Sequence, residues 1–270
     1  MSTNPPKIIS ESNLSHAWGK AFLAAMTGRN DLAPFTISID GLTNGLPAED
    51  ECIRTTLDLA LGQNGKYAAA ISAMTIFPFK FWNLNKQPHV KEFSELYLRK
   101  YLPRLRARDP RNRKGTYFER MISFQGVRKK RGTLSTESKN QLLHIVSLWP
   151  KEGKGRRPRR SALQVAIFDP VKDHNGSPRS VFPCLQQVSF TYDNTGGVAV
   201  NAYYPSQYIF DRAYGNYLGL CHLGYFMGKE LGLQFVRLNC FIARPELGDV
   251  TKEALRDLER TVQDALQEAH

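Results

Sequence analysis

The hydrophobic pattern of the first half of the chain switches between helical and strand periodicity. Residues 12–26 place apolar side chains three and four positions apart, which predicts a helix behind a Ser/Asn cap. Residues 35–39 alternate with period two and predict a strand. Helical spacing returns over residues 48–61, 67–76, 91–101 and 138–148.

The second half of the chain is richer in strand patterns. Strands are predicted over residues 163–168, 184–192, 198–204 and 234–242, and the segment 193–197 has the composition of a hairpin turn. A long apolar helix is expected over residues 209–231 and a charged amphipathic helix over 251–268. This order predicts a single α+β domain over residues 1–270, in which helices cover one face of a mainly antiparallel or mixed sheet.

The composition agrees with a folded domain. The chain has 270 residues, of which 41% are hydrophobic and 11% aromatic, and this excludes disorder over most of the length. No apolar run is long enough to cross a bilayer, and the first residues lack the pattern of a signal peptide. The four cysteines are too sparse for a disulfide framework. We therefore expect a cytoplasmic protein with free thiols and no membrane partner.

The positive charge is concentrated in one region. Residues 101–160 hold 18 of the 37 lysines and arginines, and the formal net charge of the whole chain is +12. Such a region can bind a nucleic-acid backbone or attract a phosphorylated substrate, and solvated loops are the alternative interpretation. Glycine and proline near the basic runs 128–131 and 151–160 predict surface loops there.

Histidine and glycine patterns exclude two other classes of site. The six histidines show no metal-ligand spacing with one another or with the cysteines. No glycine-rich loop of the P-loop or dinucleotide-binding type is present. We therefore expect no metal site and no nucleotide cradle of those kinds.

One cysteine is distinguished by its surroundings. Cys184 lies at the start of a predicted strand, directly after a polar segment, where a thiol can be held rigidly near the surface. A free cysteine in a strand is more often a small buried hydrophobic residue. The neighbouring motifs favour a functional thiol, and along the chain they are Tyr117-Phe118-Glu119-Arg120, Asn140-Gln141-Leu142, Arg159-Arg160, Phe168-Asp169-Pro170, Pro183-Cys184, Ser206, Asn216 and Glu230-Leu231-Gly232.

The order and spacing of these motifs resemble the thymidylate synthase family, most clearly over residues 117–247. The resemblance implies a thymidylate synthase-like fold and a pyrimidine nucleotide substrate. In that family a cysteine thiolate adds to carbon 6 of the base, and carbon 5 then attacks the methylene group of methylenetetrahydrofolate. Cys184 matches this nucleophile. Asn216 matches the asparagine whose amide reads a uracil-type base, and Ser206 matches a serine near the phosphate.

The resemblance also implies a homodimer, because the family's dimer packs sheet on sheet and shares arginines between sites. Arg159 and Arg160 resemble the arginine pair that reaches the phosphate of the partner subunit's substrate, and the planar arginine fork suits that group. An ungapped alignment places Ser161 and Ala162 at those positions, and a two-residue insertion restores the match. Arg120 is a further candidate for substrate binding.

The sequence departs from the family at several positions. Pro205 replaces an arginine that contacts phosphate and supports the thiolate, and Tyr208 replaces an aspartate that contacts the base and the folate. No glutamate precedes the helix-borne tryptophan, and Arg244 is the closest counterpart of a histidine and tyrosine near the end of the later strand. Without a nearby cation, a thiol keeps a pKa of about 8.5. The candidates to supply this cation are the arginines at positions 120, 159, 160 and 244.

Two aromatic residues are candidates for folate binding. Tyr208 occupies a position shared by the substrate and folate sites, and Trp82 is a candidate for the wall of the folate pocket, with core packing as the alternative. We therefore predict a transferase that modifies carbon 5 of a pyrimidine nucleotide, with the departures indicating a non-standard substrate. The alternatives are an inactive relative that binds nucleotide as a sensor or partner, and a protein that binds nucleic acid through residues 101–160.

Overall fold

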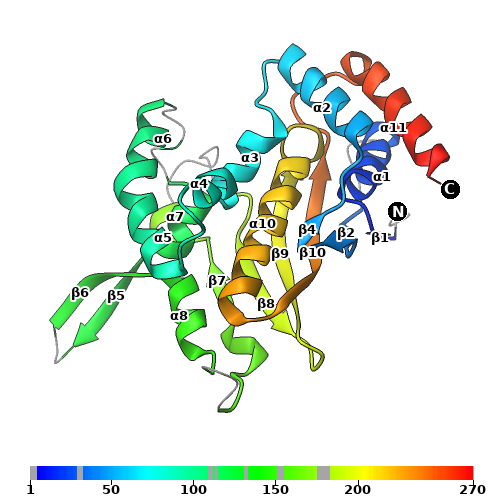
Figure 1. Ribbon diagram of the computed structural model, residues 1–270. Helices are drawn as coiled ribbons and strands as arrows, with labels where there is room; N and C mark the ends of the chain where they lie inside the picture. Colours follow the sequence, from blue (N-terminus) through cyan, green and yellow to red (C-terminus); the bar gives the residue numbers. More distant parts are fainter. Residues whose placement is uncertain are drawn as a thin grey trace.

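The computed structural model describes residues 5–28, 33–108, 112, 115–130, 133–150, 155–174 and 183–269, without the side chains of 127–130 and 133–136. Its centre is a mixed sheet of six strands in the order β1-β2-β10-β9-β8-β7 (Figure 1). This confirms the expected α+β class. The strands are β1 (Lys7–Glu11), β2 (Phe35–Ile39), β7 (Gln164–Ala166), β8 (Gln187–Tyr192), β9 (Gly197–Tyr208) and β10 (Gln234–Glu246).

The two longest strands, β9 and β10, are parallel neighbours. Val236 has no partner on β9, because Phe235 pairs with Val198 and Arg237 pairs with Ala199. This bulge sets the register of the rest of β10. β1 and β2 are also parallel, whereas the remaining pairs in the sheet are antiparallel.

Two hairpins lie outside the main sheet. The shorter one joins β3 (Leu42–Thr43) to β4 (Leu46–Pro47). The longer one joins β5 (Phe124–Lys130) to β6 (Thr133–Lys139) and projects from the body of the protein in Figure 1. The expectation of a loop over the basic run 128–131 is therefore wrong for residues 128–130. Residues 128–130 pair continuously with residues 133–135, and residue 131 lies outside the described residues.

Most of the expected helices are present. The long helix expected over residues 209–231 begins with one wide π turn, η5 (Ile209–Ala213), and continues as α10 (Tyr214–Leu231). The helix expected from residue 138 begins instead at Gln141, because the Asn140 side chain accepts the backbone N–H of Leu143 at 2.9 Å and caps it. The other helices are α1 (Leu14–Thr27), α2 (Glu51–Gln63), α3 (Ala69–Ile76), α4 (Phe79–Leu84), α5 (Val90–Leu96), η1 (Tyr97–Tyr101), α6 (Leu102–Arg108), α7 (Tyr117–Ile122), α8 (Gln141–Leu148), η4 (Arg160–Ala162), α9 (Pro170–Asp173), η6 (Glu253–Leu255) and α11 (Arg256–Glu268).

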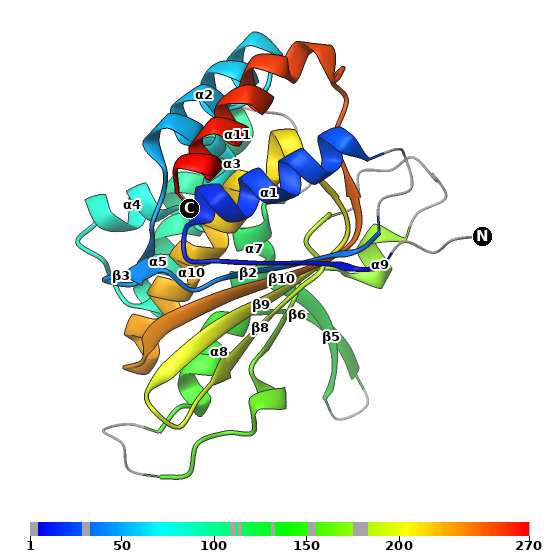
Figure 2. The ribbon, with the colours of Figure 1, turned by 90° about the vertical axis from the view of Figure 1, so that its right-hand side faces the viewer.

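The helices cover the apolar face of the sheet. Alternate residues of β9, from Val198 to Tyr204, are buried beneath α10. Figure 2 shows α1 along the sheet, with α2 and α11 stacked beyond it. Helices α10 and α3 approach closely at Gly215, which has no side chain. A Cβ atom added at this position would lie 2.4 Å from the Ala69 carbonyl oxygen. A larger residue at position 215 would therefore separate these two helices.

The opposite face of the sheet carries a row of small polar side chains. Ser38 donates to the Asn239 side-chain oxygen at 3.0 Å, and the Asn239 amide donates to Asn201 at 2.9 Å. The Asn201 amide continues the row to Thr191 at 3.2 Å. Beside this row, two half-exposed aromatic rings stack with their centroids 6.0 Å apart, those of Tyr203 and Phe241. We call the four polar residues and the two aromatic residues together the outer-face row.

Helix α1 holds both ends of the π turn η5. The Trp18 indole donates from Nε1 to the Ile209 carbonyl oxygen at 2.8 Å. The Ser15 hydroxyl lies 2.7 Å from the Tyr214 hydroxyl, and both residues are buried. Because η5 joins the end of β9 to α10, these two bonds fix the direction in which α10 leaves the sheet.

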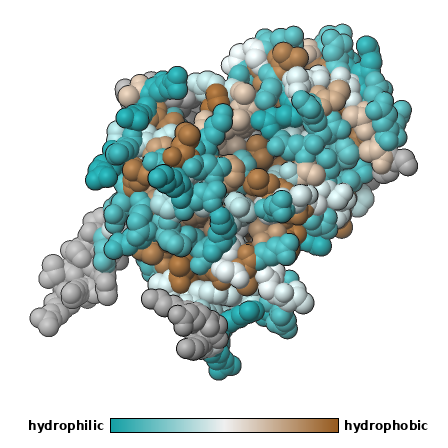
Figure 3. Space-filling view, viewed as in Figure 1, coloured by the Kyte–Doolittle hydropathy of each residue, from teal (hydrophilic) through white to brown (hydrophobic). Residues whose placement is uncertain are grey.

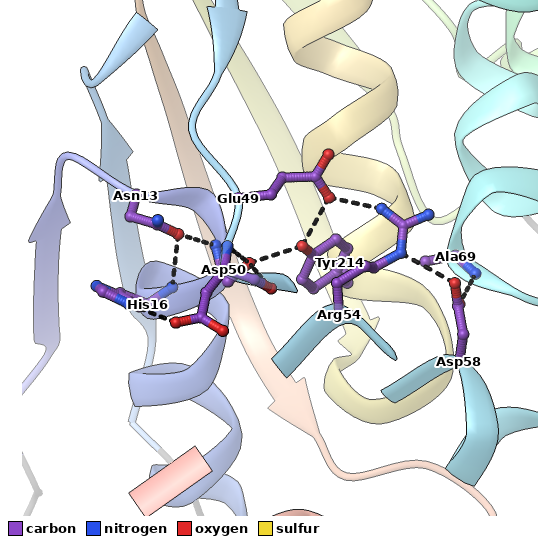
Figure 4. A network of polar contacts seen from close by, with 9 residues as sticks. Asn13, His16, Glu49, Asp50, Arg54, Asp58, Ala69 and Tyr214 are labelled. Carbon is purple, nitrogen blue, oxygen red and sulfur yellow. Dashed lines mark hydrogen bonds and ion pairs between the residues drawn. The ribbon is translucent and has the colours of Figure 1, made fainter. Parts of the chain in front are cut away.

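The polar network around Tyr214 extends to two more helices, as Figure 4 shows. The Tyr214 hydroxyl donates to Glu49 Oε2 at 2.7 Å, and the same oxygen accepts Arg54 Nη1 at 2.5 Å. Arg54 also donates from Nε to Asp58, whose Oδ1 accepts the backbone N–H of Ala69 at 2.8 Å. The network therefore ties α2, α3 and α10 together.

The surface seen in Figure 3 is mainly polar, and apolar side chains appear there in small groups. The most exposed large apolar side chains include Leu84 on α4 and Val171 on α9. Within the described part of the chain, no helix combines the length and the apolar character needed to span a membrane.

Removal of the Tyr214 hydroxyl tests the anchoring of α10. We expect Tyr214→Phe to lower the free energy of unfolding by about 1–3 kcal/mol, because the buried Ser15 hydroxyl and the Glu49 carboxylate lose their shared partner. Denaturant unfolding measures this difference. Tyr225→Phe on the same helix is the matched control, since Tyr225 contributes its ring to packing and we expect no comparable loss. Equal stabilities of the two variants would contradict the anchoring role.

Candidate active site

Cys184 lies three residues before β8, beside the end of β9. Its neighbour Leu185 is fully buried, and the backbone N–H of Gln186 donates to the Tyr203 carbonyl oxygen at 3.0 Å. These contacts fix the backbone next to the cysteine. Cys184 itself is exposed, whereas Cys221 and Cys240 are buried. The structure therefore holds Cys184 rigidly at a position that solvent can reach.

Charged groups from two elements surround the Cys184 thiol. Desolvation by the surrounding protein is the largest effect and raises the pKa of the thiol above its ordinary value, although part of the residue is exposed. The charge of Arg212 and a hydrogen bond from Tyr117 oppose this shift, whereas Asp211 and Glu246 reinforce it. The thiol is therefore mainly protonated at neutral pH, and its reactivity depends on the balance of these charges.

The ends of β9 and β10 bring further predicted residues together. Parallel pairing places Ser206 opposite Arg244 and Tyr208 opposite Glu246. The Ser206 hydroxyl donates to Glu246 Oε1 at 2.8 Å, and Arg244 Nε lies 3.4 Å from the same oxygen. Since Glu246 also acts on the Cys184 thiol, these side chains form one cluster. We call these five residues, together with Asp211 and Arg212, the thiol cluster.

A cavity of about 420 Å³ adjoins the thiol cluster. Tyr208 and Arg244 line it and have exposed side chains. The other lining residues come from the end of α1 and the segment after β10, and include Gly28, Leu247, Gly248, Val250 and Lys252. A second cavity of about 450 Å³ lies between β1 and α1, but none of the predicted site residues line it. The cavity beside Tyr208 is therefore the candidate binding pocket.

Asn216 lies in the first turn of α10, and only 4% of its surface is exposed. Asn216 follows Arg212 by about one helical turn, so both residues lie toward the same side of the helix. An amide has the donor and the acceptor needed to read a base edge, but Asn216 does not line the cavity beside Tyr208.

Arg120 has a structural role in this fold. Its guanidinium holds both carboxylate oxygens of Asp173, at 2.5 and 2.8 Å, and also donates to the Ile167 carbonyl oxygen at 3.0 Å. Asp173 is 6% exposed, so this ion pair is largely buried. These contacts engage both terminal nitrogens of Arg120 and link α7 to α9.

Arg159 and Arg160 lie at the other end of β8. Arg160 donates from Nε to the Tyr192 carbonyl oxygen at 2.8 Å and lies over the Tyr192 ring. Tyr192 ends β8, whereas Cys184 precedes its first residue. Both arginines are exposed. The length of β8 therefore separates them from the thiol cluster of their own subunit.

Trp82 packs in the core. Only 2% of its surface is exposed, and its indole donates to the Pro88 carbonyl oxygen at 2.9 Å. Its ring contacts Phe77, Tyr225 and Phe226 edge-on. Of the two interpretations of Trp82, core packing describes these contacts, and Trp82 does not line the cavity beside Tyr208.

Three residues of the site carry no separate signal in the sequence. Tyr117 belongs to the motif that ends in Arg120, but its position beside Cys184 depends on the packing of α7. Glu246 follows Arg244 by two residues and shares its edge of the sheet. Arg212 lies six residues after Ser206, and the wide turn η5 interrupts the periodicity that would have placed it.

The structure also bears on metal binding. Within the described residues, no group of three or more histidine, cysteine, aspartate or glutamate side chains is arranged to hold a metal ion.

The Arg120–Asp173 pair predicts how stability varies with pH. Arg120 and backbone hydrogen bonds hold the pKa of Asp173 below its ordinary value, despite desolvation, so the pair stabilises the fold above about pH 4 and loses this effect as the pH falls through the folded-state pKa. We expect Asp173→Asn to cost about 3 kcal/mol at pH 7 and less at low pH. Denaturant unfolding between pH 7 and pH 2 measures the difference. A difference that stays constant down to pH 2 would contradict this role.

Comparison with known proteins adds no relative to this picture. A scan of the chain against models of protein families finds no match, and a search of curated proteins finds no significant match. The resemblance to the thymidylate synthase family therefore rests on the quoted sequence motifs alone.

Proposed function

We propose that the protein is a thymidylate synthase-like transferase that modifies carbon 5 of a pyrimidine nucleotide. The observation that carries this proposal is the thiol cluster. Cys184 and Ser206 match motifs of the family, whereas Tyr208 and Arg244 stand where the sequence departs from it. All four lie at one edge of the sheet beside a cavity. Core packing alone would not require an exposed thiol, an exposed tyrosine and an exposed arginine at this edge.

The chemistry begins at Cys184. Its thiolate forms a bond to carbon 6 of the base while the π electrons of the 5,6 double bond move toward carbon 5 and the O4 oxygen. Carbon 5 can then take up a one-carbon unit, and loss of the carbon 5 proton restores the double bond and expels the thiolate. Asn216 supports this step by holding the base, since its amide can donate to a carbonyl and accept from a ring N–H.

The residues that would bind the phosphate of the substrate differ from the family pattern. Ser206 and Arg244 offer a hydroxyl and a guanidinium, but Glu246 binds both of them. Pro205 supplies no charge, where the family has an arginine. A carboxylate among the phosphate-binding groups weakens the attraction for a dianion. This arrangement supports a substrate other than that of ordinary thymidylate synthesis.

The lining of the cavity supports methylenetetrahydrofolate as the cofactor. Methylenetetrahydrofolate would supply a one-carbon unit at the methylene level of oxidation. The exposed ring of Tyr208 and the apolar side chains of Leu247 and Val250 would contact its pterin ring. Asp211 Oδ1 is buried without a hydrogen-bond partner in the described residues and adjoins Gly248 on the cavity wall, so it offers an acceptor for a ligand N–H. Trp82 does not line this cavity.

A homodimer would complete the site. Arg159 and Arg160 lie too far along β8 to serve Cys184 of their own chain, so we assign them to the partner's site. The outer-face row supports a sheet-to-sheet contact, because two stacked aromatic rings stand half-exposed among small polar groups. An isologous two-fold interface would place this row against its own copy.

Disruption of the outer-face row tests the dimer. We expect the wild-type protein to sediment as a dimer and Tyr203→Glu to sediment as a monomer, because the substitution buries a charge in the interface. Leu84→Glu is the matched control, since Leu84 is 82% exposed on α4 and belongs to the helical side. A monomeric wild-type protein, or dimers of all three proteins, would contradict this interface.

Covalent trapping tests the catalytic proposal. We expect the protein to gain the combined mass of a 5-fluoropyrimidine nucleotide, such as 5-fluoro-dUMP or 5-fluoro-UMP, and methylenetetrahydrofolate. Once carbon 5 has bonded to the methylene group, fluorine cannot leave as a cation in place of the proton, so both molecules stay attached. Intact mass spectrometry measures the gain. Cys184→Ser should abolish the adduct, whereas Cys52→Ser, which removes the other exposed cysteine, should retain it. An adduct that survives Cys184→Ser would contradict the nucleophile.

A second candidate function is supported by the β5–β6 hairpin. This hairpin carries Arg128, Lys129 and Lys130 and projects from the body of the protein (Figure 1). A projecting basic hairpin suits contact with a nucleic-acid backbone. Salt-dependent binding of RNA or DNA, together with no adduct from any uridine or cytidine analogue, would favour an inactive nucleotide- or nucleic-acid-binding protein over the transferase.

A further inference from the structure

An arginine-rich segment lies against the end of β8. Its four arginines are all exposed, and they are Arg156, Arg157, Arg159 and Arg160. The Tyr192 hydroxyl donates to the Pro158 carbonyl oxygen at 2.7 Å. Arg157 donates from Nη1 to the Asp193 carbonyl oxygen at 3.2 Å, and Arg160 donates from Nε to that of Tyr192 at 2.8 Å. Three points along the segment are therefore bonded to the end of the strand.

Two half-buried aromatic rings lie beneath these arginines. Trp149, the residue after α8, meets the Tyr192 ring edge-on, with the centroids 5.1 Å apart. The Arg157 guanidinium lies 5.4 Å from the centroid of each ring, within the range of cation–π attraction. We call Trp149, Arg156, Arg157 and Tyr192 together the arginine–aromatic surface.

These contacts orient the guanidinium groups without neutralising them. The partners of Arg157 and Arg160 are carbonyl oxygens and aromatic rings, and within the described residues no arginine of the segment pairs with a carboxylate. Elsewhere in the fold, Arg106, Arg237 and Arg256 each pair with one. Fixed positive groups that lack an internal anion attract an external one.

The combination of fixed cations and aromatic rings fits one class of polyanion. Phosphates repeat along a nucleic-acid strand, and the arginine fork binds them through several donors. Guanidinium planes and aromatic rings also offer faces on which unpaired bases stack. A double helix keeps its bases stacked inside it, so such faces favour a single strand.

We propose that the arginine–aromatic surface binds single-stranded nucleic acid. The proposal does not depend on the transferase, and it does not need Arg159 or Arg160, which were assigned to the partner's substrate. The surface is also separate from the β5–β6 hairpin, which precedes α8, whereas Trp149 follows it. Because α8 has eight residues and is about 12 Å long, one strand can reach from this surface to the hairpin.

Fluorescence anisotropy of a labelled oligo(dT) strand of about twelve nucleotides, titrated with the full chain at several salt concentrations, tests this surface. We expect Arg156→Gln/Arg157→Gln to bind about tenfold more weakly at low salt. The slope of log K against log salt should fall by about 1.4, since each lost phosphate contact removes about 0.7.

Arg256→Gln/Arg260→Gln is the matched control for this experiment. It removes the same charge from exposed positions of α11, which lies far from α8 in both views (Figures 1 and 2). We expect this variant to bind as the wild type does. Equal losses in the two double variants, with both folded by circular dichroism, would overturn the proposal.

Tryptophan fluorescence tests whether bases stack on the surface. Trp18 and Trp82 are at most 2% exposed, so Trp149 is the tryptophan that a base can reach. We expect oligo(dT) to quench the emission of the wild type, and Trp149→Phe to lose this quenching while it still binds. Heparin that binds as tightly as oligo(dT), with no quenching by either, would indicate a general polyanion surface and reject the single strand.

The outcomes separate this surface from the other proposals. Arg156→Gln/Arg157→Gln should retain the 5-fluoropyrimidine adduct, and loss of the adduct would place these arginines in the substrate site instead. Intact strand binding without any adduct in the wild type would reject the transferase and retain the surface. Strand binding that is lost in Arg128→Gln/Lys129→Gln but not in Arg156→Gln/Arg157→Gln would assign the strand to the hairpin and reject this surface.

Discussion

The site depends on the hold that α1 has on the turn between β9 and α10. The Trp18 indole satisfies the Ile209 carbonyl, and the Ser15 hydroxyl meets Tyr214 at the first residue of α10. A wide helical turn is less favourable than an ordinary one, so its persistence requires partners on its flanks. Because Asp211, Arg212 and Asn216 all lie within two turns of these contacts, a helix from the N-terminal third of the chain determines the geometry of groups near residue 212.

The Cys184 environment is a balance between desolvation and charge. Crowding by protein favours the neutral thiol, and one arginine opposes two carboxylates. A fully buried thiol such as Cys240 is held neutral by its apolar surroundings, with no charge to oppose this effect. Cys184 differs because small changes in nearby charge move its protonation, and a ligand that brings or removes charge would have the same effect. This sensitivity distinguishes Cys184 from a packed thiol such as Cys240.

Local sequence patterns predicted the elements that follow simple periodicity. The strand at residues 35–39 was assigned with its observed bounds, because alternate side chains there are fully buried and half-buried. The sequence pattern did not predict β1, because its alternation of apolar and polar residues is weak and Ile8 is 77% exposed on an edge strand. Motif order led to Cys184 and Ser206, and departures from the family pattern led to Tyr208 and Arg244. No pattern in the sequence indicated Arg212 or the carboxylate that engages Arg120. Those pairings join segments far apart in the chain, and no local pattern encodes them.

The bulge at Val236 determines where the chain can change in length without disturbing the site. One unpaired residue separates two parts of β10: Gln234 and Phe235, which follow the end of α10, and the stretch from Arg237 onward, which is aligned with β9. An altered connection after α10 can be absorbed at the bulge, while Ser206 stays opposite Arg244 and Tyr208 stays opposite Glu246. A one-residue insertion after Arg237 cannot be absorbed at the bulge. It would turn every later side chain of β10 to the other face of the sheet. Homologous chains should therefore vary in length before residue 236 and keep a constant length between residues 237 and 246.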